Sequence, residues 1–223
     1  MNDLSKKGLV ELIGTFLLTF IGGAAIINGQ AGLIGVALAH GLTVAIVISA
    51  LGHISGGHIN PAVTIGFLVT RKIDLKEGGI YILSQLVGAV FAAFALKQFV
   101  PGAMNASLGG QSVAPSVDLG AAIGIEFILT FFLVTAIFGT AVDERGTFQS
   151  IAGFGIGLVV TVDILAGGPL TGASMNPARS FGPALISGHW DNHLVYWIGP
   201  LLGGTIAALI YDRFIMNNAG KKD

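Results

Sequence analysis

The feature that most constrains the fold of this chain is a series of six apolar stretches, each long enough to cross a lipid bilayer. A helix rises about 1.5 Å per residue, so about 20 apolar residues span the hydrocarbon core. Only 10% of the residues are charged, whereas about 25% is usual in a soluble domain. We therefore expect an all-α membrane protein with spanning helices at approximately 8–28, 33–52, 78–100, 119–142, 148–168 and 194–215.

Composition excludes several classes of function. The formal net charge of −1 gives no basic face for a nucleic-acid partner. The chain has no Cys, which excludes disulfides, thiolate metal sites and cysteine nucleophiles. Its 34 Gly residues favour a bundle in which helices approach closely, as they do in lipid.

Basic residues are distributed asymmetrically across the predicted spans. The predicted outer loops, residues 101–118 and 188–193, contain no Lys or Arg. By the positive-inside rule, both chain ends are then cytoplasmic. The residues that carry this prediction are Lys6, Lys7, Arg71, Lys72, Lys76, Arg145, Arg213, Lys221 and Lys222.

The two halves of the chain resemble each other. Glu11 begins ELIGTFLLTF and Glu126 begins EFILTFFLV, while Asn60 begins NPAVTIG and Asn176 begins NPARSFG, at nearly the same offset. Each half contributes three spans, so the second half enters the membrane from the opposite side. We expect one domain over residues 1–223, with inverted repeats at approximately 8–100 and 119–215. Inverted repeats commonly place a substrate path near the midplane, between interrupted helices.

Two segments, residues 53–70 and 167–186, are apolar but too short to cross the membrane, so we expect them to re-enter it. Pro61 and Pro177 suit a first helical turn, and Asn60 and Asn176 suit the N-cap positions before it. Two half-helices inserted from opposite faces would then meet with their positive dipole ends at the midplane. The stretches GGH and GAS before them are expected to be extended, with carbonyls facing water.

Paired Asn-Pro-Ala sequences, the first preceded by SGGHI and the second continuing as NPARS, resemble the aquaporin, or major intrinsic protein, family over essentially the whole chain. The resemblance implies a passive, single-file water channel that excludes protons at the two motifs, assembled as a homotetramer and needing no cofactor. It implies that the Asn60 and Asn176 amides donate hydrogen bonds to water; the alternative is that they are only helix caps. The motif residues are Asn60, Pro61, Ala62, Asn176, Pro177 and Ala178, and the pore carbonyls are those of Gly56, Gly57, His58, Gly172, Ala173 and Ser174.

The same resemblance implies a selectivity filter of His40, Ile164, Ala173 and Arg179. This pattern is similar to that of plant tonoplast intrinsic proteins, several of which pass ammonia, hydrogen peroxide or urea besides water. Ile164 makes one wall apolar, so we expect a broader pore than a water-specific one. The alternative for His40 is a hydrogen bond between helices without pore contact.

The alternative is that the chain is a glycerol facilitator. In glycerol facilitators the second motif reads NPARD, and the filter contains Trp and Phe. Here Ser180, Ala184 and the Tyr196-Trp197 pair follow the water-channel pattern, so glycerol is the less favoured solute.

Several polar residues allow two interpretations. The resemblance implies that Glu11 and Glu126 hold the re-entrant loops through backbone N–H groups; the alternative is a proton relay. His53 and His58 fit packing, or a cytoplasmic gate at His58, better than a metal site, since a third ligand is lacking. Asp163 faces either the outer vestibule or an adjacent helix. The segment HWDNH, residues 189–193, is read as a solvated loop, with a response to pH or metal as the alternative.

Two other functions compete with a channel. A secondary transporter also uses inverted repeats, but it would need coupling-ion ligands at the midplane, where two Asn amides and helix N-termini repel cations. An enzyme is disfavoured because no nucleophile, base and orienting group converge in any motif. We expect a cell-membrane location, with a vacuolar membrane as the alternative.

Overall fold

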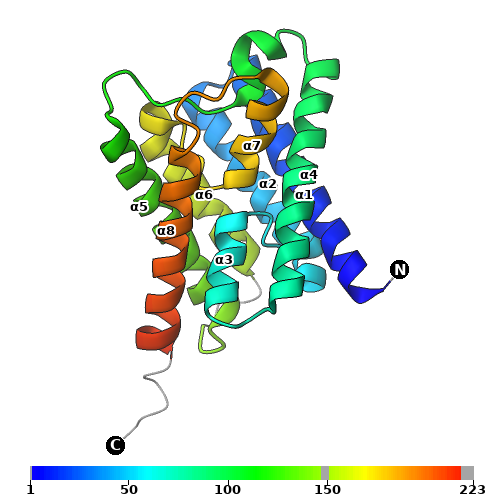
Figure 1. Cartoon of the computed structure of the whole chain (residues 1–223), viewed down its shortest axis with the longest axis vertical. Helices are drawn as coiled ribbons and strands as arrows, with labels where there is room; N and C mark the ends of the chain where they lie inside the picture. The colour runs from blue at the N-terminus through cyan, green and yellow to red at the C-terminus, as the bar shows by residue number, and fades with distance from the viewer. Residues whose placement is uncertain (1, 147–150, 217–223) are drawn as a thin grey trace, which may run out of the picture.

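The computed structural model describes residues 2–146 and 151–216, and six long helices dominate it (Figure 1). All six are long and apolar enough to span a membrane, which confirms the predicted spans. They are α1 (Asp3–Asn28), α2 (Gly32–Ser55), α4 (Leu75–Phe99), α5 (Leu119–Ile137), α6 (Ala152–Thr171) and α8 (Val195–Ile210). Short π-helical turns, Phe138–Val142 and Tyr211–Met216, extend α5 and α8. The predicted start of the fifth span at residue 148, and Lys221 and Lys222, lie outside the described residues.

Two short helices, α3 (Pro61–Val69) and α7 (Pro177–Ser187), occupy opposite halves of the bundle (Figure 1). They contain 9 and 11 residues, which is about 15 Å and therefore half a hydrocarbon core. Each begins as predicted, with Pro in the first turn and an Asn side chain capping it. Asn60 Oδ1 accepts from the Ala62 N–H at 2.8 Å, and Asn176 Oδ1 accepts from the Ala178 N–H at 3.1 Å.

The segments before the two half-helices are not extended, which corrects the expectation for GGH and GAS. Several of their residues adopt the left-handed conformation, with φ of 63° at Gly57, 44° at Ile59, 45° at Ala173 and 54° at Met175. The backbone must turn from the end of a spanning helix into a half-helix within a few residues. Left-handed residues produce that turn, whereas extended backbone would carry the chain away.

Close helix packing relies on glycine at matching places in the two halves. A methyl group on Gly88 of α4 would collide with the backbone carbonyl of Leu12 in α1. A methyl group on Gly203 of α8 would collide with that of Phe127 in α5. Small residues therefore let the backbones touch, as is usual in membrane bundles. Large apolar side chains such as Ile34, Ile46, Leu83, Phe91 and Ile128 point outward instead.

Candidate functional site

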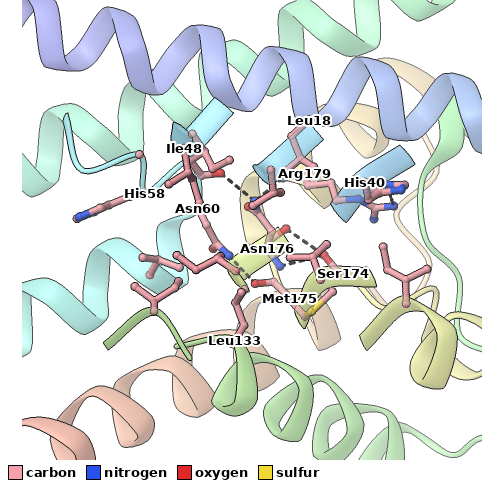
Figure 2. A pocket seen from close by; sticks show the side chains of 18 of the residues that line it. Leu18, His40, Ile48, His58, Asn60, Leu133, Ser174, Met175, Asn176 and Arg179 are labelled. Atoms are coloured by element: carbon pink, nitrogen blue, oxygen red, sulfur yellow. Dashed lines mark hydrogen bonds between the residues drawn. The ribbon is translucent and has the colours of Figure 1, made fainter. Parts of the chain in front are cut away.

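A cavity passes the facing N-terminal ends of the two half-helices (Figure 2). It joins residues from both halves of the chain, including Asn60 near its centre and Arg179 and His58 toward its two ends. Most of its wall is apolar, and these side chains were not predicted from the sequence. They are Leu18, Val44, Ile48, Val63, Leu133, Ile137, Ile156 and Val160.

The two capping Asn residues lie side by side at the centre of the cavity (Figure 2). Asn60 Nδ2 donates to the carbonyl of Met175 at 2.8 Å, and Asn176 Nδ2 donates to the carbonyl of Ile59 at 2.9 Å. Each half-helix is therefore tied to the loop before the other. A carboxamide has two N–H donors, so one N–H on each Asn has no partner among the described residues. Since the opposite wall is apolar, these N–H groups are the polar features available at the centre.

Glu11 and Glu126 stand behind these loops and are fully buried. Their carboxylates make equivalent hydrogen bonds in the two halves. Glu11 accepts from the N–H groups of His58 and Ile59 at 2.9 and 2.6 Å. Glu126 accepts from those of Ser174 and Met175 at 2.9 and 2.7 Å. A hydroxyl also donates to each carboxylate, from Ser55 and Thr171 respectively, both at 2.7 Å.

All four residues of the predicted filter line the same cavity, toward the end nearer residues 101–118 and 188–193, which we call the outer end. Arg179 Nη2 donates to His40 Nε2 at 2.7 Å. His40 Nδ1 lies 2.8 Å from the carbonyl of Val36. Together these bonds fix the neutral tautomer, with the proton on Nδ1 and a lone pair on Nε2. Gly22 leaves room for the ring, because a methyl group there would collide with it.

Gln111 is a site residue that sequence reasoning missed. Its side-chain amide lies against the guanidinium of Arg179; with its oxygen on that side, its nitrogen donates to Ser180 Oγ at 2.9 Å. The loop that carries it folds over the outer end, where the Ala114 N–H donates to the carbonyl of Leu170 at 2.8 Å. No periodicity or motif marks residue 111. Its only sequence signal is an amide side chain within an outer loop of small residues.

The other predicted residues lie around the cavity rather than all within it. Gly57, His58 and Ser174 line it, and Gly172 lines a separate vestibule at the outer end with Gln111. Gly56 does not line the cavity and is exposed. The remaining motif residues, Pro61, Ala62, Pro177 and Ala178, are buried in the first turns of their helices.

His58 lies at the opposite end of the cavity from His40 (Figure 2). Its ring centroid is 4.2 Å from that of Phe67 and 5.1 Å from that of Tyr81. Its Nδ1 lies 3.2 Å from Thr64 Oγ1. The ring is therefore both packed and in contact with the cavity.

Asp163 is buried, with 2% of its surface exposed, and it lines neither the cavity nor the vestibule. Its Oδ2 has no hydrogen-bond partner within residues 2–146 and 151–216.

Comparison with known proteins identifies relatives over nearly the whole length of the chain. The family model described as "Major intrinsic protein" matches residues 1–211. Aquaporin TIP4-4 of Zea mays is 45% identical, across 95% of this chain and 87% of that protein. Aquaporin TIP1-1 of Arabidopsis thaliana is 40% identical, across 96% and 89%. Among solved structures, the aquaglyceroporin from Plasmodium falciparum superposes with a TM-score of 0.86 at 27% identity, covering 96% of this chain and 98% of its own.

Proposed function

Because this chain belongs to the major intrinsic protein family, a family of membrane channels and not of enzymes, we propose that its cavity is a single-file pore for water and small neutral solutes. The chain is a multi-pass membrane protein and its family supports passive passage of water. The proposed solutes beyond water are ammonia, hydrogen peroxide and urea. The observation that carries the proposal is the pair of free Asn N–H groups facing an apolar wall.

This pair supports proton exclusion as well as water passage. A water molecule at the centre would accept hydrogen bonds from Asn60 and Asn176, with both lone pairs engaged. It would then have no lone pair with which to relay a proton along the file. The N-termini of α3 and α7 meet there and add their positive dipole ends, which raise the barrier to cations.

The outer constriction supports a broader solute range than water alone. Arg179, His40 and Gln111 supply its polar side, whereas Ile164 and Ala173 supply an apolar side. Small neutral molecules with one polar edge match such a lining. One solved structure similar to this chain is an aquaglyceroporin, so glycerol is the second candidate solute.

Stopped-flow flux into proteoliposomes tests the proposal with water, methylammonium, urea and glycerol as solutes. We expect water flux with a low activation energy and measurable flux of urea and of methylammonium, which stands in for ammonia, with glycerol slower than water. An alternating-access carrier would instead show a high activation energy. Glycerol flux faster than water, or vesicles as impermeable as bare lipid, would overturn the proposal.

We also propose the assembly and orientation. The two halves, approximately 8–100 and 119–215, form one channel domain of inverted repeats, and four chains form a homotetramer with one pore each. Both termini face the cytoplasm, in the cell membrane, with the vacuolar membrane as the alternative. The basic residues support this orientation, since Lys72 pairs with Asp212 at 3.0 Å and Arg145 donates to the Ile215 carbonyl at 3.1 Å, at one end of the bundle. A protease added outside sealed cells should leave both termini intact if this orientation is correct.

A further inference from the structure

A cluster of aromatic rings covers α7 at the outer end of the molecule. It consists of Phe181, Trp190, His193 and Trp197, and we call it the outer cap. The ring of Phe181, two residues after Arg179, lies 5.9 Å from that of Trp190 and 6.4 Å from that of Trp197. His193 lies 4.7 Å from Trp190. Two indoles thus hold the half-helix that carries Arg179, and the imidazole contacts both of them.

One hydrogen bond in the outer cap requires a neutral imidazole. Trp197 Nε1 donates to His193 Nε2 at 3.0 Å. An indole nitrogen is a donor only, so Nε2 must carry a lone pair and the proton of the neutral ring must sit on Nδ1. Protonation makes both ring nitrogens donors. It would break this bond and leave the indole N–H facing another donor.

Few titratable groups surround His193. A small pocket behind the cap is lined by His193 and by the titratable residues His189, Asp191 and Tyr196, while α7 and the Gln111 loop contribute only uncharged side chains to it. His189 Nε2 lies 3.6 Å from Asp191 Oδ2, so the carboxylate already has a partner. The Tyr196 hydroxyl donates to the carbonyl of Thr171 at 2.9 Å.

The same pocket connects the outer cap to the constriction. Gln111 and Ser180 line it together with His193. Gln111 in turn contacts the guanidinium of Arg179. A change at His193 therefore reaches the filter by two routes, through Phe181 on α7 and through the pocket that Gln111 shares.

Partial burial lowers the pKa of His193 below its ordinary value. A histidine whose pKa is lowered by folding stabilises the folded structure in full above about pH 6.5, the ordinary pKa of histidine. That stabilisation is lost as the pH falls from there through the lowered pKa. Attraction between the imidazolium and the indole faces opposes this loss.

We propose that the outer cap is a pH-sensitive clamp on α7, closed by neutral His193 and released when this residue is protonated, so that acid widens the outer constriction. The inference rests on the proposed channel function and adds regulation to it. It assigns a role to HWDNH, for which the sequence favoured an ordinary solvated loop.

Tryptophan fluorescence tests the clamp directly, because the two Trp residues of the chain, Trp190 and Trp197, both belong to the outer cap. The full chain in lipid vesicles should show one fluorescence transition with a midpoint below about pH 6.5. His193→Gln should abolish it, because the amide oxygen accepts from Trp197 without titrating. His189→Gln should retain it. A transition that persists in His193→Gln, or that is absent from the unmodified chain, would overturn the clamp.

The flux consequence is measured on the same vesicles. The ratio of urea to water permeability should rise about threefold between about pH 8 and about pH 5, the effect of losing one neutral hydrogen bond. In His193→Gln the ratio should stay constant. A constant ratio in the unmodified chain across its fluorescence transition would refute coupling to the pore. Vesicles that pass no water at either pH would overturn the proposed function and this coupling together, while the fluorescence would still report whether the cap titrates.

Discussion

Arg179 and His40 are joined by a 2.7 Å hydrogen bond from a guanidinium nitrogen to an imidazole lone pair, so one residue of the proposed filter positions the other. They come from different halves of the chain, α7 and α2. Gln111 contacts the same guanidinium from the outer loop. In the proposed pore, the width of the outer constriction would therefore depend on a cation held by two neutral side chains.

Removing either partner should loosen the constriction. A hydrogen bond to a charged group contributes about 1.5–3 kcal/mol. We expect His40→Ala to raise the ratio of urea to water permeability by about tenfold, the rate equivalent of 1.4 kcal/mol. Gln111→Ala should raise this permeability ratio less, because water at the outer loop can replace the lost side-chain amide. Stopped-flow flux measures both ratios.

The double variant distinguishes a shared role from two separate ones. Because both side chains hold Arg179, the effects of His40→Ala and Gln111→Ala should be non-additive by about 0.5 kcal/mol or more. Ile164→Val, on the apolar side of the constriction, is the matched control and should add independently to either. Strict additivity of His40→Ala and Gln111→Ala would contradict a common hold on Arg179.

Glu126→Ala should destabilise the loop before α7. The change removes the carboxylate that accepts hydrogen bonds from the buried N–H groups of Ser174 and Met175. Each unsatisfied buried group costs about 1–3 kcal/mol, which lowers the thermal midpoint by about 2–4 °C per kcal/mol in a chain of this size. The midpoint is measured on purified protein in detergent.

Glu11→Ala should produce a similar loss, since Glu11 makes the equivalent bonds in the first half. The Gln variants separate support from proton relay. If the carboxylates support the loops, Glu126→Gln lowers the thermal midpoint less than Ala does and retains water flux per folded chain. A Glu126→Gln protein that is as stable as the unmodified chain but inactive would favour the relay.

The spans, half-helices and capping Asn residues could be predicted because each follows from local rules. Runs of about 20 apolar residues fix the spans, and an Asn-Pro pair marks a helix start wherever it lies. The helix positions of the filter, His40 and Ile164, came from the resemblance of the motifs. The structure places both on the cavity.

The apolar wall, Gln111 and the loop conformations could not be predicted from the sequence. Every spanning helix is apolar around most of its circumference, so Leu133 facing the cavity and Phe132 facing outward look alike in sequence. Gln111 reaches Arg179 only because its loop folds inward, a tertiary event without a local signal. The left-handed φ of Ile59 and Met175 likewise depends on the carboxylates that hold their N–H groups.

Asp163→Asn should stabilise the protein. The side chain is buried in α6 and its Oδ2 has no partner among the described atoms. Placing a charge in such a position is costly, whereas a carboxamide has the same shape and no charge. We expect a thermal midpoint higher by about 2–4 °C, equivalent to about 1 kcal/mol, with unchanged water flux. Loss of flux in a stable Asp163→Asn protein would instead assign Asp163 to the pore.

Two glycines on α4 test whether close backbone contact holds the bundle together. A methyl group on Gly88 would meet the Leu12 carbonyl of α1, which cannot move without shifting the helix. A methyl group on Gly79 would meet no atom within 4 Å. In both positions Ala improves helix propensity by about 1 kcal/mol, so this contribution cancels in the comparison. We therefore expect Gly88→Ala to lower the thermal midpoint, by an overpacking cost of about 1–3 kcal/mol, and Gly79→Ala to raise it slightly. Equal midpoints for the two variants would mean that α1 and α4 can separate freely, and the close contact would then not be what stabilises the first half.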